Sequence, residues 1–285
     1  MSSLVVIAVY GFREALRRKV FAVVLVLTLG FLFLFWLANH FVFGDLASIQ
    51  PPEDVNVDTR TFAGSFLTGL AMFATLFLGV VLAVFLTLGV VSGDAERGLL
   101  QPLVVRPVGR NALLGARYLG AVAVCAVYVV AVYTAAMGIT AWAGGWWPDR
   151  IVLPAVELAV GVAIVAALSL LGSIFLTATA NGIAIFMTFG AGLVAGLLGQ
   201  VGESIGSPTL KHVARIASWI FPFEALYEDG LNALTRDTRG FTSFALRLGP
   251  FGGAHSGGAW LVLWTIAYLS FVAVAALVAF GRRDL

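Results

Sequence analysis

Residues 158–202 read LAVGVAIVAALSLLGSIFLTATANGIAIFMTFGAGLVAGLLGQVG, and no charged residue interrupts this stretch. As one continuous helix it would measure roughly 68 Å, about twice the ~30 Å hydrocarbon core of a bilayer. The stretch therefore predicts a hairpin of two membrane-spanning helices. Its clearest turn signal is the segment 177–182, which ends on Asn181-Gly182. We therefore expect the chain to reverse there.

The composition of the whole chain agrees with a membrane location. Of its 285 residues, 60% are hydrophobic and only 11% are charged, whereas about 25% of residues are charged in a typical soluble domain. A water-soluble fold cannot hide so much apolar side chain, so a soluble enzyme and a disordered chain are both excluded. The formal net charge of +2 gives no overall basic field that would favour nucleic acid as a partner.

The other charge-free runs are each long enough for one crossing. The sequence thus predicts an all-α membrane protein with six transmembrane helices in a single transmembrane domain, residues 1–285. The runs are continuously apolar, which favours helices over the alternating strands of a membrane barrel. The expected spans are about 20–43, 65–91, 113–142, 155–177, 182–200 and 259–280. A loop at 92–112 joins helices 2 and 3, and a longer loop at 201–258 joins helices 5 and 6.

The distribution of basic residues predicts which side each loop faces. Basic residues cluster before the first span and in the loop 92–112, whereas only Arg60 and Arg150 lie in the first two loops on the other side. By the positive-inside rule, the N- and C-termini are cytoplasmic and the protein lies in the plasma (inner) membrane. The loop 201–258 carries five further basic residues on the outer side, but long loops translocate with less regard to charge.

The segment before the first span has the pattern of an interfacial helix. Residues 4–19 place apolar side chains such as Phe12 on one helical face and basic side chains elsewhere. The segment predicts a helix that contacts membrane lipid and then bends into the first span. The alternative is a plain basic flank. The residues expected to form this interfacial elbow are Phe12, Arg13, Arg17, Arg18 and Lys19.

The loop 92–112 mixes charge, glycine, proline and leucine. Its leucines form a short apolar face with charged neighbours, as in an amphipathic helix that docks into a groove on a partner; an ordinary connecting loop is the alternative. The candidate coupling residues are Asp94, Glu96, Arg97, Gly98, Leu99, Leu100, Leu103, Arg106, Pro107 and Arg110.

This loop resembles a known family. The order of Asp94, Glu96, Arg97, Gly98, Leu100, Arg106, Pro107, Val108, Arg110, Leu114, Gly115 and Gly120 is similar to that in permease subunits of ABC-2-type ABC transporters. The nearest subgroup in character contains the nitrous-oxide-reductase maturation permease and sodium- or drug-efflux permeases. The resemblance implies an N-terminal elbow helix, a cytoplasmic coupling helix between helices 2 and 3, and short outer helices between helices 5 and 6.

The resemblance also implies a division of labour. In this family a separate ABC ATPase subunit hydrolyses ATP, and two permease subunits and two ATPase subunits form the transporter. The chain itself is expected not to be an enzyme and to hold no cofactor. A phosphate-binding loop needs a lysine after a glycine, and Lys19 and Lys211, the two lysines, follow Arg18 and Leu210.

Two glycines in the fifth span suit close helix contacts. Gly192 and Gly196 form a small-xxx-small pair, which fits either a contact in a permease homodimer or heterodimer or packing within the chain. A second pattern lies at 223–234, where apolar side chains share one helical face; a gate helix and a helix on the outer membrane surface both fit it. Glu157 and Asn39 fall near the outer ends of their spans, and we expect both at the interface.

Three functions fit these observations to different degrees. The first is the permease of an exporter, which forms the path for an unidentified substrate. The second is a membrane scaffold that couples an ATPase to assembly or maturation outside the membrane. The third is an intramembrane enzyme, which would need paired carboxylates or histidines near an interface; the sequence shows no such set.

Overall fold

The computed structural model describes residues 19–46, 58–88, 110–234 and 257–282, and every regular element in these ranges is an α-helix. The described helices are α2 (Lys19–Leu46), α3 (Thr59–Thr87), α5 (Arg110–Gly144), α6 (Val152–Phe175), α7 (Ala178–Ser204), α8 (Pro208–Ile220), α9 (Pro222–Leu234) and α11 (Gly258–Arg282). Six of them, all except α8 and α9, are long and apolar enough to cross a bilayer. The prediction of six helical spans is therefore confirmed.

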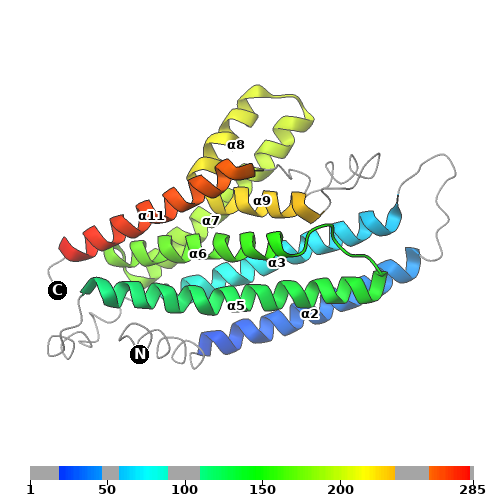
Figure 1. Ribbon diagram of the computed structural model, residues 1–285, viewed down its shortest axis with the longest axis horizontal. Coiled ribbons are helices and arrows are strands. Elements are labelled where there is room, and N and C mark those ends of the chain that lie inside the picture. The colour runs from blue at the N-terminus through cyan, green and yellow to red at the C-terminus, as the bar shows by residue number, and fades with distance from the viewer. Residues whose placement is uncertain (1–18, 47–57, 89–109, 235–256, 283–285) are drawn as a thin grey trace.

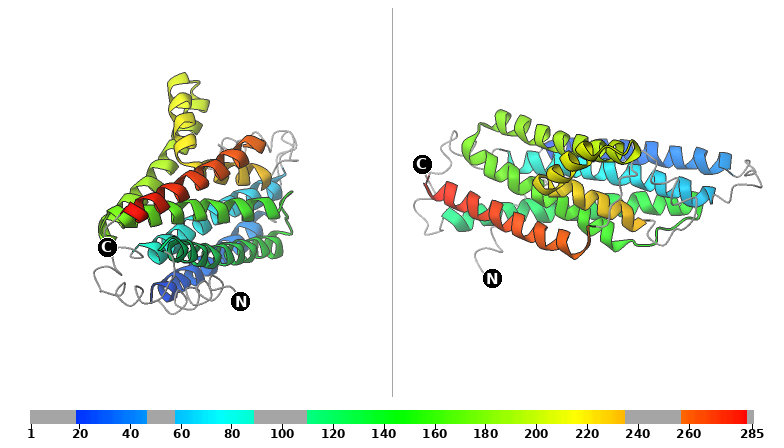
Figure 2. Two further views of the ribbon diagram at one scale, coloured as in Figure 1. Left: turned by 60° about the vertical axis from the view of Figure 1, so that its left-hand side comes forward. Right: turned by 90° about the horizontal axis from the view of Figure 1, so that it is seen from above.

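The six long helices lie side by side and alternate in direction (Figure 1). At one end of the bundle α3 ends, α5 begins, α6 turns into α7 and α11 ends; we call this the hairpin end. At the other end α5 connects to α6, and α3 and α11 begin; we call this the loop end. The last turns of α7 and the whole of α8 project from one side of the bundle near the loop end (Figure 2).

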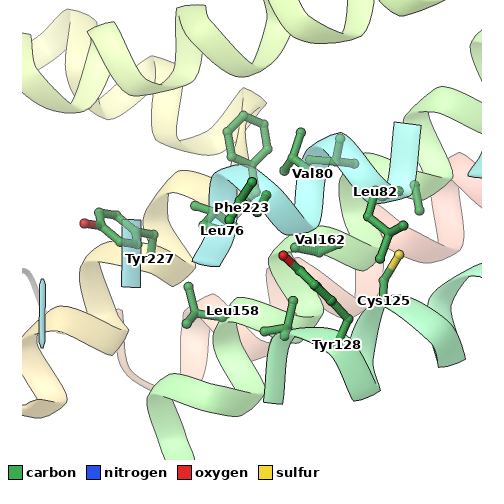
Figure 3. Close-up of a cluster of buried hydrophobic side chains, with 14 of the residues drawn as sticks. Leu76, Val80, Leu82, Cys125, Tyr128, Leu158, Val162, Phe223 and Tyr227 are labelled. Carbon is green, nitrogen blue, oxygen red and sulfur yellow. The ribbon is translucent and has the colours of Figure 1, made fainter. Parts of the chain in front are cut away.

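Helices α3 and α6 form the centre of the bundle. In each of these two helices, 67% of the most apolar 18-residue segment is buried inside the protein, whereas the corresponding share is 17% for α2 and 22% for α11. Their shared core contains Leu76 of α3 and Val162 of α6, and it also receives side chains from α5 and α9, among them Cys125 and Phe223 (Figure 3). The exposed faces of α2 and α11 are apolar, as expected of helices in contact with lipid.

Polar side chains in the spans mostly bond to their own helix. The Thr75 hydroxyl donates to the Ala71 carbonyl at 2.7 Å, and the Asn39 amide donates to the Phe35 carbonyl at 2.8 Å. Such bonds let a hydroxyl or amide lie in hydrocarbon, where a polar group without a hydrogen bond destabilises the protein by roughly several kcal/mol. Asn39 is fully buried and Glu157 is 7% exposed, so both side chains are covered by the protein. Their expected position near the outer interface stays a prediction.

Helix α3 begins six residues before the expected start because Asp58 caps it. The Asp58 carboxylate accepts hydrogen bonds from the backbone N–H groups of Arg60 and Thr61 and from the Thr61 hydroxyl. The hydroxyl of Thr61 is the main reason that the pKa of Asp58 lies below its ordinary value. The cap stabilises a first turn that hydropathy alone would assign to a loop.

The reversal in the hairpin α6–α7 is shorter and earlier than predicted. Helix α6 ends at Phe175, α7 begins at Ala178, and the Thr177 hydroxyl caps α7 by accepting from the Ala180 N–H at 3.4 Å. The prediction that Asn181 and Gly182 form the turn is therefore wrong, because both lie within the first turns of α7. The threonine cap places the turn, and it leaves the Asn181 side chain free to pack against α6.

Helices α8 and α9 form a hairpin that enters the bundle from the loop end. Gly206, with φ of 69°, terminates α7, and Pro208 begins α8. Helix α8 then runs back along α7, so that an added Cβ at Gly202 would lie 2.7 Å from Leu210 and one at Gly192 would lie 3.4 Å from the Phe221 Cβ. The tip of the hairpin therefore lies partway along α7.

Helix α9 returns from this tip to the loop end through the centre of the bundle. It packs most extensively against α6, and its last carbonyl, that of Leu234, accepts from the Asp149 N–H at 3.1 Å. The apolar face predicted at 223–234 exists, and its burial argues against the alternative of a helix on the membrane surface. The members of that face are buried within the chain: Phe223, Leu226, Tyr227, Leu231 and Leu234.

We predict that Gly192→Ala lowers the melting temperature of the purified protein in detergent. The new Cβ would lie 2.7 Å from the Phe223 ring, which is itself 1% exposed and cannot move aside freely. Overpacking of this kind costs about 1–3 kcal/mol. Gly190→Ala is the matched control, because nothing lies within 4 Å of an added Cβ there. Equal melting temperatures for the two variants would contradict the packing of α9 against α7.

Candidate functional site

The predicted coupling residues lie almost entirely outside the described residues. Asp94, Glu96, Arg97, Gly98, Leu99, Leu100, Leu103, Arg106 and Pro107 fall between α3 and α5, and Arg110 is the first residue of α5. In the predicted elbow, Lys19 is the first residue of α2, and Phe12, Arg13, Arg17 and Arg18 lie outside the described residues. The structure does place the helices from which the coupling segment leaves and to which it returns.

An apolar layer closes the bundle at the hairpin end. Leu114 from the second turn of α5 packs with Leu170 and Ile174 of α6 and with Phe280 of α11. These side chains are nearly fully buried. The start of α5 is therefore fixed to the ends of α6 and α11, immediately after the coupling segment returns to the bundle.

Two buried hydrogen bonds connect three helices next to this layer. The Thr87 hydroxyl, on the last residue of α3, donates to the Ser169 hydroxyl of α6 at 2.8 Å. The Asn181 amide of α7 donates to the Ser169 carbonyl at 2.8 Å. We call Thr87, Ser169 and Asn181 the serine joint; their exposures are 1%, 0% and 0%.

Gly172 makes the joint sterically possible. An added Cβ at Gly172 would lie only 2.1 Å from the Asn181 Oδ1. The Asn181 side chain therefore fits against α6 only because residue 172 is a glycine. Sequence reasoning treated Asn181 as a turn residue and did not consider Thr87 or Ser169. The available signal was polar: Asn181, Ser169 and Thr87 lie in apolar runs, where a hydrogen-bonding side chain tends to join helices.

The two glycines predicted for helix packing or a dimer both face α9 of the same chain. Gly192 lies against the Phe223 ring, and Gly196 lies against the Glu224 carboxylate, whose Oε1 would be 1.8 Å from an added Cβ. Both glycines are buried. Within this chain they provide the space in which the hairpin α8–α9 sits.

A cavity of about 320 Å³ opens near the loop end, between α7, α8, α9 and α11; most of its lining surface is apolar, but several charged side chains reach it. Charged side chains from three helices line it: Glu203 from α7, Lys211 and Arg215 from α8, and Glu224 and Glu228 from α9. Three tryptophans are also part of the lining: Trp219, Trp260 and Trp264. Sequence reasoning missed this cavity because its members are spread over segments that only the fold brings together.

The described residues contain no group of three or more histidine, cysteine or acidic side chains arranged to hold a metal ion. Cys125, the single cysteine, is buried in the core. The features that the structure does provide are a polar link between helices at one end and a charged cavity at the other.

These features define a class before they define a family. Six apolar helical spans, a buried polar joint and a helical hairpin inserted between the last two spans are the architecture of a multi-pass membrane protein. A family model described as ABC-2 family transporter protein matches residues 5–285. The chain belongs to that family, so it is an ABC transporter permease, and its family implies partnership with an ABC ATPase subunit. No curated protein matches the chain.

We predict that Thr87→Val destabilises the purified protein by about 0.6 kcal/mol, and by no more than about 1.7 kcal/mol, the range for hydrogen bonds between membrane helices. The substitution keeps the shape of the side chain and removes the bond from α3 to α6. Thr134→Val is the matched control, since the Thr134 hydroxyl bonds only to carbonyls of its own helix. Thermal unfolding in detergent measures both; identical stabilities would contradict a contribution of the serine joint.

Proposed function

We propose that this permease forms the path by which an unidentified substrate is exported across the plasma membrane. A separate ATPase subunit binds and hydrolyses ATP and engages residues 92–112. Two permease subunits, identical or different, and two ATPase subunits form the transporter. The hairpin end, where α11 ends, faces the cytoplasm, and the loop end faces outward. The resemblance at 94–110 further favours the nitrous-oxide-maturation and efflux-like subgroup.

The serine joint is the observation that supports mechanical coupling. Thr87 is the last residue of α3, so the joint lies at the end of the helix that precedes the coupling segment in the sequence. A displacement of that segment by a partner would act on Thr87 and, through Ser169, on α6 and α7 together. Such contacts, together with the packing of α3 against α6, would couple the movements of these helices in a rigid-body switch between two packed arrangements.

The hairpin α8–α9 supports an outward gate. It enters the bundle from the loop end and contacts α6 and α7, the helices that the serine joint connects. Close approach at Gly192 and Gly196 places α9 directly against α7. A movement of α7 at the hairpin end is therefore transmitted to α9 near the loop end, where the hairpin would open or close the path.

The proposed orientation is tested by labelling introduced cysteines. Native Cys125 is 1% exposed and should not react. We predict that a membrane-impermeant maleimide labels Arg150→Cys, at the loop end, in intact cells. Thr179→Cys, an exposed position at the hairpin end, should be labelled only after the membrane is permeabilised. The reverse pattern would overturn cytoplasmic termini.

The coupling segment is tested by charge removal. We predict that Glu96→Ala or the double variant Arg97→Ala, Arg106→Ala reduces co-purification of the ATPase subunit by about tenfold or more, because charged interface contacts typically contribute this much. Membrane insertion and yield should not change. Arg150→Ala is the matched control, since Arg150 is an exposed basic residue at the opposite end. Normal assembly of the Glu96 and Arg97/Arg106 variants would exclude this segment as the docking site.

Export and scaffolding differ in what crosses the membrane. If vesicles that contain the assembled complex hydrolyse ATP but move none of a panel of fluorescent amphipathic probes, the scaffold function gains over export. ATP-dependent movement of any one probe, lost together with ATPase assembly in the coupling variants, supports the permease function.

A further inference from the structure

The charged side chains that line the cavity differ in how deeply they are buried. Glu224 is 5% exposed and lies against Gly196 at the inner wall, and Glu228, one turn further along α9, is partly buried. Lys211 and Arg215 are exposed and lie one turn apart on α8. Glu203 of α7 is also exposed. The cavity thus offers negative charge at its inner wall and both signs, with two cations from one helix, at its mouth.

Tryptophans place this cavity at the level of a membrane interface. The Trp219 ring lies 5.0 Å from that of Trp264 and 6.2 Å from that of Trp260, and the Trp264 indole N–H donates to the Trp219 carbonyl at 3.0 Å. Tryptophan concentrates at the headgroup level of bilayers. Its ring faces also attract organic cations. The cavity therefore lies where lipid headgroups lie and offers surfaces that suit an ammonium group.

The helices that line the cavity also expose apolar side chains to their surroundings. On α8, Val213 and Ile216 are about half exposed, and Leu263 of α11 is 60% exposed. None of the α8 residues is buried, so its apolar face is open alongside the cationic residues. A ligand with its polar group in the cavity would have hydrocarbon contacts immediately outside it.

We propose that this cavity binds the zwitterionic headgroup of a phospholipid from the outward-facing leaflet. The ammonium group lies at the inner wall against Glu224 and Glu228. The phosphate lies at the mouth against Lys211 and Arg215, and the acyl chains lie along the exposed faces of α8 and α11. The order of charges in such a headgroup, with phosphate next to the glycerol and ammonium at the tip, matches the order of charges in the cavity.

The volume agrees with this assignment. A cavity of about 320 Å³ lies at the lower end of the usual range for small-molecule sites, which suits a headgroup without its acyl chains. The proposal goes beyond the transport function, because lipid binding at this site does not require the ATPase. It is tested on the full permease chain alone.

Native mass spectrometry of the purified chain in detergent measures the binding. The chain is titrated separately with dioleoyl phosphatidylethanolamine, with dioleoyl phosphatidylglycerol, which lacks the ammonium group, and with dioleoyl trimethylammonium propane, which lacks the phosphate. We expect one phosphatidylethanolamine per chain, bound about tenfold more tightly than either of the other lipids, since each charge-assisted contact has about this effect. Equal binding of the three lipids would overturn the proposal.

Variants separate the cavity from other lipid contacts. Glu224→Gln and Arg215→Gln should each reduce phosphatidylethanolamine binding about tenfold. Arg215 is exposed, so its substitution does not depend on repacking the core, and Arg150→Gln is the matched control because Arg150 does not line the cavity. An equal loss in Arg150→Gln, or no loss in Arg215→Gln, would overturn the proposal.

Soluble O-phosphoethanolamine separates a lipid from a free zwitterion. Competition by this compound only at concentrations far above those of the lipid supports the lipid assignment, because the acyl chains then contribute to binding. Equal competition, with the same dependence on Arg215 and Glu224, would overturn the lipid assignment and assign the cavity to a soluble zwitterion.

Discussion

Hydrocarbon is a poor solvent for every polar atom in this chain, and that constraint explains most of its structure. Backbone groups are satisfied by helices, and hydroxyls such as Thr75 and Thr28 bond to carbonyls one turn earlier in their own helices. A few side chains also bond between helices. The serine joint links α3, α6 and α7 through side chains that are at most 1% exposed, although the Thr87 hydroxyl also lies 2.7 Å from the Ala83 carbonyl of its own helix.

The two ends of the bundle differ in the chemistry they present. The hairpin end is closed by an apolar layer around Leu114 and Phe280 and held by the serine joint. The loop end contains the inserted hairpin α8–α9 and a cavity with charges of both signs. Helices α6 and α7 carry the serine joint at one end, and both pack against the hairpin α8–α9. Of the two, only α7 lines the cavity. A ligand there would thus act on α7 directly and on α6 through α9.

Hydropathy predicted the six spans because length and charge content alone decide which segments cross a bilayer. It failed where single side chains decide the outcome. Asp58 extends α3 beyond its apolar run, and the Thr177 cap moves the hairpin turn ahead of Asn181. The amphipathic pattern of 223–234 predicted a helix but left its partner open, because the same apolar face suits a membrane surface or a groove in the bundle. Only the fold shows that Gly192 and Gly196 of α7 leave room for this helix inside the bundle.

The position of α9 also sets an order of events during biosynthesis. Helices α3 and α6 emerge from the ribosome long before residues 222–234, yet Phe223 fills space between them and α7. Until α9 arrives, the face of α6 that carries Glu157 lacks its main covering element. The nascent bundle must therefore hold an open, partly polar groove in the membrane, which insertion factors or lipid headgroups would have to shield until the chain is nearly complete.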